Sequence, residues 1–95
     1  MRRGRIDDNQ QAIVNILRTT GATVVVLSGV GKGVPDLLVG FRGVTLLMEI
    51  KDGKKPPSDR KLTTDQQKWH AEWRGGALAI VDSADSALRM IGVIK

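Results

Sequence analysis

The sequence GVPDLLVGFRGVTLLMEIK, residues 33–51, contains two short apolar runs on either side of a Gly-Phe-Arg-Gly turn. Runs of this length that are bounded by glycine predict two β-strands, and the Arg-Gly pair suits a two-residue hairpin loop because glycine readily adopts positive φ. The only charged residues within the runs are Asp36 on the first and Glu49 and Lys51 on the second. A half-buried strand gains no stability from carboxylates, so these charges point to a site.

The predicted hairpin brings the three charges together. With the Arg-Gly pair at the centre of the turn, Asp36 lies opposite Glu49, and a turn centred one residue earlier places it opposite Leu47. Side chains alternate between the two faces of a strand, so Glu49 and Lys51 point the same way. In either register an aspartate, a glutamate and a lysine converge.

Two carboxylates a few Å apart repel each other unless one is protonated or a cation lies between them. Mg²⁺ is a common solution, held by one or two carboxylates, waters and a substrate phosphate. A neighbouring lysine can orient the attacking water or stabilise charge that develops on the phosphate. The pattern therefore favours phosphodiester hydrolysis, and the alternative is a surface hairpin with a cross-strand salt bridge, which contributes little stability.

The sequence resembles the PD-(D/E)xK nuclease superfamily and, more narrowly, the VRR-NUC family. The resemblance spans residues 8–82 and rests on Gly33-Val34-Pro35-Asp36, Glu49-Ile50-Lys51-Asp52-Gly53, Leu62-Thr63-Thr64-Asp65-Gln66, Trp69 and His70. It implies an α/β fold, a restriction-endonuclease-like core in the order αβββαβα with a mixed central sheet flanked by helices. We expect one such domain over residues 1–95.

The resemblance also implies an activity, namely DNA cleavage that depends on Mg²⁺ or Mn²⁺. Small stand-alone members of the family, often encoded by phages, resemble Holliday junction resolvases and act as homodimers. We therefore expect an endodeoxyribonuclease that acts as a homodimer and cuts structured DNA, four-way junctions in particular. We expect it in the cytoplasm, which for a phage protein would be the cytoplasm of the host. The alternative is a nucleic-acid-binding module that is non-catalytic or has another specificity, for flap or duplex DNA or for RNA.

By the same resemblance, the predicted catalytic residues are Asp36, Glu49, Lys51 and Gln66, and the predicted metal ligands are Asp36, Glu49, the Ile50 carbonyl and Asp8. Asp8 stands nearest the position of an acidic residue in the family's first helix, but the register can slip to Asp7 or Gln11, and Asp8 can instead cap the helix. Gln66 either hydrogen-bonds the site or serves only in a capping box with Thr63.

The composition agrees with a polyanionic partner. The 95 residues carry a formal net charge of +5 and contain no cysteine, which excludes disulfides and thiolate zinc sites. No apolar run approaches the ~20 residues that span a bilayer, so we expect no membrane partner. The predicted nucleic-acid contacts are Lys32, Lys54, Lys55, Arg60, Lys61 and Lys68, and a basic arm of Arg2, Arg3 and Arg5 is either a phosphate contact or a free terminus.

The remaining pattern predicts the other elements. Helices are expected over residues 7–20, 63–74 and 83–91, the first capped by Asp7 or Asp8 and the last by Asp82 or Ser83. Residues 22–27 and 77–81 read as buried strands. On the second helix, Trp69 and Trp73 are expected to pack in the core or at a dimer contact, and His70 shares a face with Gln66.

Overall fold

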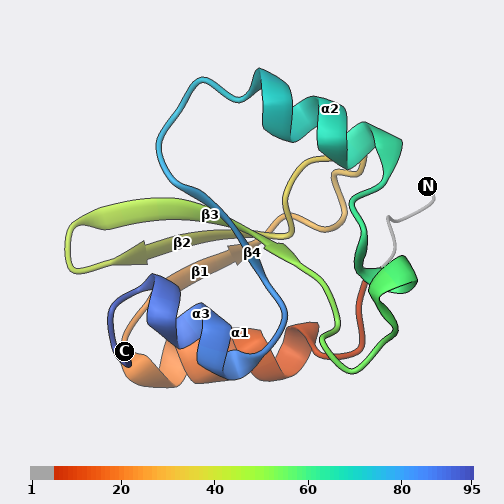
Figure 1. Cartoon of the computed structure of the whole chain (residues 1–95). Helices are drawn as coiled ribbons and strands as arrows, with labels where there is room; N and C mark the ends of the chain where they lie inside the picture. The colour runs from red at the N-terminus through yellow and green to blue at the C-terminus, as the bar shows by residue number, and fades with distance from the viewer. Residues whose placement is uncertain (1–5) are drawn as a thin grey trace.

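The computed structural model describes residues 6–95 as three α-helices, one short 3₁₀ helix and four strands (Figure 1). In chain order these are α1 (Gln10–Thr20), β1 (Thr23–Val26), β2 (Leu37–Phe41), β3 (Val44–Ile50), η1 (Pro57–Arg60), α2 (Thr64–Glu72), β4 (Leu78–Val81) and α3 (Ala84–Met90). The predicted order αβββαβα is confirmed. The basic arm predicted at Arg2, Arg3 and Arg5 lies outside the described residues.

The strands form one mixed sheet in the order β1-β2-β3-β4, in which β4 runs parallel to β3 and the other pairs are antiparallel. The β2–β3 hairpin has the first of the two predicted registers, because Leu37 pairs with Met48 and the next step places Asp36 opposite Glu49. Its turn residues Arg42 and Gly43 have φ of 48° and 81°. Positive φ at both positions matches the right-handed twist of the strands and fixes this register.

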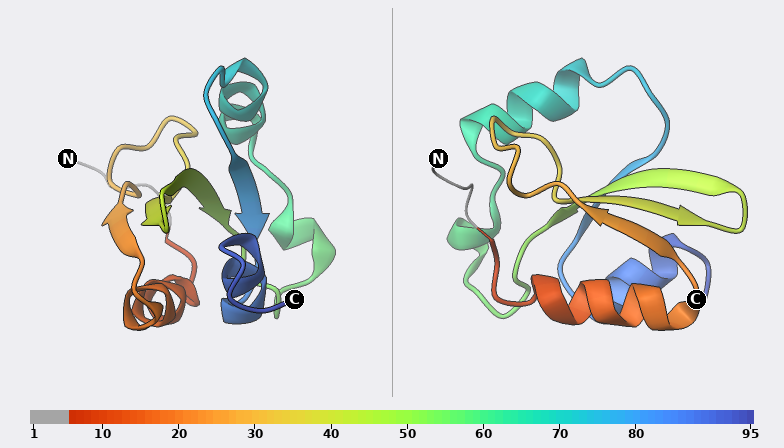
Figure 2. Two further views of the ribbon diagram at one scale, coloured as in Figure 1. Left: turned by 90° about the vertical axis from the view of Figure 1, so that its left-hand side faces the viewer. Right: turned by 180° about the vertical axis from the view of Figure 1, so that it is seen from behind.

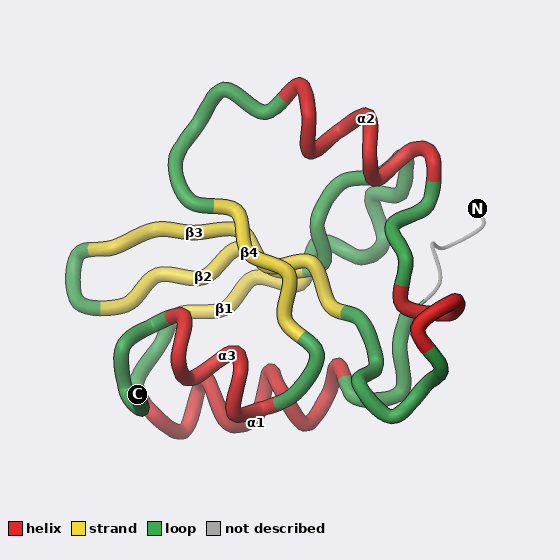
Figure 3. The backbone as a smooth tube through the Cα atoms, viewed as in Figure 1, coloured by secondary structure: helices red, strands yellow, loops and turns green. Residues whose placement is uncertain are grey.

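The helices lie on both sides of the sheet (Figures 2 and 3). Helices α1 and α3 pack side by side against one face, and α2 lies beyond the opposite face. Helix α1 buries an apolar stripe of Ile13, Val14 and Leu17, spaced as a helix that covers a sheet requires. These side chains meet the core-facing residues of the central strands, Leu37, Val39, Leu46, Met48 and Ile50.

Strands form where the sequence predicted them, at residues 23–26 and 78–81, but the expectation that they are buried was wrong for part of each strand. Strands β1 and β4 are the two edges of the sheet. Val25, Val26 and Ile80 are 46%, 45% and 54% exposed. A short apolar run does not distinguish an edge strand from a central one, because both bury at least one face.

Helix caps tie the elements to one another. Neither Asp7 nor Asp8 caps α1, because the helix begins after Asn9, whose side-chain amide donates instead to the Lys51 carbonyl at 3.2 Å and the Asp82 carbonyl at 3.1 Å. The start of α1 is thereby joined to the ends of β3 and β4.

The two later helices begin with capping boxes, as their sequences predict. Thr63 and Gln66 form the box of α2, and Ser83, not Asp82, forms that of α3 with Ser86. Within residues 6–95, no helix is long and apolar enough to cross a membrane.

Candidate active site

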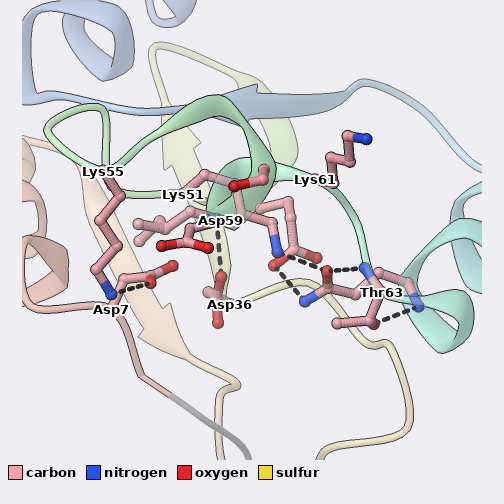
Figure 4. Close-up of a pocket in the computed structure, with 11 residues that line it drawn as sticks. Asp7, Asp36, Lys51, Lys55, Asp59, Lys61 and Thr63 are labelled. Carbon is pink, nitrogen blue, oxygen red and sulfur yellow. Dashed lines mark hydrogen bonds and ion pairs between the residues drawn. The ribbon is translucent and has the colours of Figure 1, made fainter.

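A cavity of about 360 Å³ opens where β3 ends, between the turn that precedes α1, the η1 segment and the start of α2 (Figure 4). Its lining is dominated by charged and polar side chains, namely Asp7, Asp36, Glu49, Ile50, Lys51, Lys55, Ser58, Asp59, Lys61, Thr63 and Gln66. The four residues predicted as catalytic are all among them.

Asp36 is a buried residue of the cavity lining, and neighbouring groups hold its carboxylate through hydrogen bonds. Its Oδ2 accepts a hydrogen bond from the Ile50 backbone N–H at 2.8 Å, and its Oδ1 lies 3.1 Å from the Ser28 hydroxyl. That hydroxyl is also 3.0 Å from Oε1 of Gln10, and because it has a single proton it can donate to one of the two at a time. The Asp36 carboxylate is thus held by β3 and by the loop that follows β1, and α1 joins this network through the contact of Gln10 with Ser28.

Ser28 and Gln10 were not identified from the sequence as residues that support the Asp36 carboxylate. Gln10 is buried on the same face of α1 as Ile13 and Leu17. A polar residue at a buried position of an apolar stripe requires a hydrogen-bond partner, and this was the signal that could have identified it.

Glu49 is the most deeply buried charged residue described, with 1% of its surface exposed. Its Oε2 accepts from the side-chain amide of Gln66 at 3.2 Å, and its Oε1 lies 3.2 Å from Nε2 of His70. Burial and the neighbouring Asp36 carboxylate raise the pKa of Glu49 to about 9, and the charge of Lys51 opposes this shift. Glu49 therefore holds a proton at neutral pH unless a cation replaces it.

Gln66 connects the glutamate to the lysine. Its Oε1 accepts from Nζ of Lys51 at 2.7 Å and from the Thr63 backbone N–H at 2.9 Å. With two donors facing the oxygen, the amide nitrogen must face Glu49. The two predicted roles of Gln66, in the capping box and in the site, are therefore fulfilled by one side chain.

The acidic residue that lines the cavity from the N-terminal side is Asp7, one of the two alternatives to Asp8 that the sequence left open. Asp7 lines the cavity, lies 3.6 Å from Nζ of Lys55 and contributes to the raised pKa of Glu49. Asp8 is exposed and borders a separate hollow beside Val14 and Val26. The chain turns at Asp7–Asn9 before α1 begins, so consecutive side chains point to different places.

The oxygen atoms at the base of the cavity fit a hard divalent cation. The N–H of Ile50 points toward Asp36, and its carbonyl lies on the same side of β3, because both groups of one strand residue face the same neighbour. Two carboxylates and one carbonyl are a donor set suited to Mg²⁺ or Mn²⁺, with waters and phosphate completing the shell. Among residues 6–95 there is no cluster of three or more His, Cys, Asp and Glu residues that could hold a metal by themselves.

The predicted phosphate contacts divide into two groups. Lys55 and Lys61 line the cavity. Lys32, Lys54 and Lys68 are exposed outside it, and Arg60 is half-buried in η1. The structure therefore brings two of the six basic residues to the candidate site itself.

The fold and sequence match a solved structure described as a "VRR_NUC domain". The two chains are 30% identical, the match covers 86% of this chain and 88% of that chain, and the TM-score is 0.63. The chain belongs to the VRR_NUC family. No family model and no curated protein matched the sequence. In this VRR_NUC domain, the Pro35-Asp36 and Glu49-Ile50-Lys51 motifs meet in one cavity, in a fold of the PD-(D/E)xK type.

Proposed function

We propose that this VRR_NUC domain is an endodeoxyribonuclease that depends on Mg²⁺ or Mn²⁺. The observation that carries the proposal is the convergence of Asp36, Glu49 and Lys51 in one polar cavity, where the two carboxylates cannot both be ionised without a cation. Family membership supports nuclease activity independently of this geometry.

Asp36, Glu49 and the Ile50 carbonyl would hold the ion, and Asp7 lies close enough to influence the charge of the site. A bound divalent ion supplies a Lewis acid for the scissile phosphate and lowers the pKa of water beside it. The protein holds these oxygens in place before the ion arrives, because both carboxylates already accept hydrogen bonds from neighbouring groups.

Lys51 acts on the reacting phosphate. Its buried ammonium group is fixed by Oε1 of Gln66 and has two further protons to donate. It orients the attacking water and stabilises the charge that develops on the phosphate oxygens. Lys55 and Lys61, at the wall of the cavity, bind the phosphates that flank the cut.

The proposed substrate is branched DNA, and in particular a four-way junction cut by a homodimer. A two-fold symmetric pair of sites can cut two strands of a symmetric junction. A second copy could pack on exposed apolar side chains of this domain. These are Val25 and Ile80, which lie on the face of the sheet that carries Glu49, and Trp73.

A cleavage assay tests the proposal. Four-way junction, flap, linear duplex and single-stranded DNA would be compared with Mg²⁺, Mn²⁺ or EDTA, using the wild type and Lys51→Ala. We expect paired symmetric nicks in the junction that disappear with EDTA and in the variant. Tight junction binding without any cutting would instead favour a non-catalytic binding module, and a monomer in sedimentation would contradict junction resolution.

A further inference from the structure

Helix α2 presents two side chains to Glu49. Gln66 and His70 are four residues apart, so they lie one above the other on the same face of the helix. Gln66 donates to Oε2 of Glu49, and Nε2 of His70 is 3.2 Å from Oε1. The His70 side chain is 14% exposed and that of Glu49 is 1% exposed, so little water competes for this contact.

His70 completes a regular pattern of carboxylate contacts. Oδ1 and Oδ2 of Asp36 contact Ser28 and the Ile50 N–H, and Oε2 of Glu49 contacts Gln66. Oε1 of Glu49 is the fourth oxygen, and His70 is its partner. Each oxygen keeps a further lone pair for an ion, because a carboxylate has about four acceptor positions.

The position of α2 is set by close backbone packing as well as by these side chains. Gly33, with φ of +83°, lies so close to the start of α2 that a Cβ there would overlap the Asp65 carbonyl. Trp69 and Trp73, the C-cap residue of α2, stack with 5.0 Å between their ring centroids. The helix therefore presents Gln66 and His70 to Glu49 from a defined position.

We propose that His70 is a positioning residue, the second point of a clamp by which α2 fixes the Glu49 carboxylate for a divalent ion. The inference rests on the proposed function and adds to it a residue that acts through Glu49. An ionised Glu49 can only accept, so the imidazole presents its N–H from Nε2 in the ion-bound state. Groups that orient metal ligands in this way typically change metal affinity or activity by about 10–100-fold when they are removed.

The test compares Mn²⁺ binding by isothermal titration calorimetry in four proteins: wild type, His70→Ala, His70→Gln and the control Glu72→Gln. Glu72 is exposed on the same helix and lines no part of the cavity. We expect about 10–100-fold weaker Mn²⁺ binding in His70→Ala. His70→Gln should recover most of the affinity because its amide supplies an N–H at similar reach, and Glu72→Gln should match the wild type.

Cleavage kinetics give a second readout. In His70→Ala, the lost rate should return when the Mn²⁺ concentration is raised, and the KM for DNA should be unchanged. If His70→Ala folds poorly by circular dichroism, His70→Leu replaces it, since it keeps the bulk of the side chain without the donor.

Each outcome has a distinct meaning. Provided that the wild type binds Mn²⁺ and cuts DNA, two results would overturn the positioning role. One is wild-type Mn²⁺ affinity in His70→Ala or His70→Leu, and the other is an equal loss of Mn²⁺ affinity in His70→Gln and His70→Ala. A wild type that neither binds Mn²⁺ nor cuts DNA would refute the proposed function and the inference together.

Discussion

Binding of a divalent ion should displace the proton that Glu49 holds, and this makes metal affinity depend steeply on pH. Burial and the neighbouring Asp36 raise the pKa of Glu49 to about 9 in the metal-free protein. Below that pH the carboxyl is protonated, so the ion must compete with a proton, and affinity rises with pH until it levels off above about 9.

The size of the effect follows from the pKa. At pH 7, two units below about 9, roughly one molecule in 100 has Glu49 ionised, so the apparent Kd for Mn²⁺ should be about 100-fold weaker than at the plateau. Between pH 6.5 and 8.5 the Kd should tighten about tenfold per pH unit, with close to one proton released per ion. Burial and the Lys51 charge lower the pKa of His70, so this imidazole is neutral at the upper end of the range and adds no proton there.

Isothermal titration calorimetry with Mn²⁺ in two buffers of different ionisation enthalpy measures both the Kd and the protons released. Glu49→Gln is the matched control, since it keeps the shape of the side chain and removes its titration, and it should bind weakly with no proton release. A Kd that stays constant from pH 6.5 to 8.5 in the wild type, with no proton released, would refute the argument that Glu49 holds a proton in the metal-free protein.

Three further predictions concern stability and the acidic residues near the site. Gly33→Ala should lower the free energy of unfolding by more than about 1 kcal/mol in urea denaturation, because of the positive φ and the overlap with the Asp65 carbonyl; unchanged stability would show that α2 does not pack as described. In the metal-free protein, the stabilising contribution of Glu49 is fully present below the unfolded pKa of 4.5 and is lost as pH rises toward about 9. The free energy of unfolding should therefore fall between pH 5 and pH 8, by at most about 1.4 kcal/mol per pH unit, and a rise over this range would contradict the raised pKa. Asp7→Asn should alter Mn²⁺-dependent cleavage, whereas Asp8→Asn should leave the rate within about twofold, since Asp7 alone of the two lines the cavity; the reverse result would restore Asp8 to the site.

The hairpin that carries Asp36 and Glu49 was predictable to within one residue of register, because it depends on local turn chemistry and on strand alternation, and the φ angles of Arg42 and Gly43 select one of the two registers. The start of α2 was predictable for a similar reason, since Thr63 and Gln66 satisfy backbone groups only three residues apart. These features depend on neighbours in sequence, and the sequence contains them in full.

The contacts that complete the site depend on packing between distant elements. Gln10 reaches Ser28 only because α1 packs against the sheet, and His70 reaches Glu49 only because Gly33 lets α2 approach. The exposure of β1 and β4 likewise depends on strand order, which no single strand encodes. Asp7 and Asp8 lie in a turn before α1, and this turn determines which of the two side chains enters the cavity. The sequence could not predict the outcome, because helical periodicity does not apply to residues in a turn.

The side chain of Asn9 bridges the carbonyls of Lys51 and Asp82, residues that lie 42 and 73 positions farther along the chain. Closing such long loops has an entropic cost that increases with their length, and non-local contacts of this kind slow folding. The β2–β3 hairpin can form from local contacts alone, yet the backbone at Lys51 is not anchored until β4 has paired with β3 and α1 has docked on the sheet. A chain that ends after Gln66 but before β4 contains every residue that lines the cavity, but it lacks the β4 strand and the Asp82 carbonyl, which anchor the end of β3 and the start of α1.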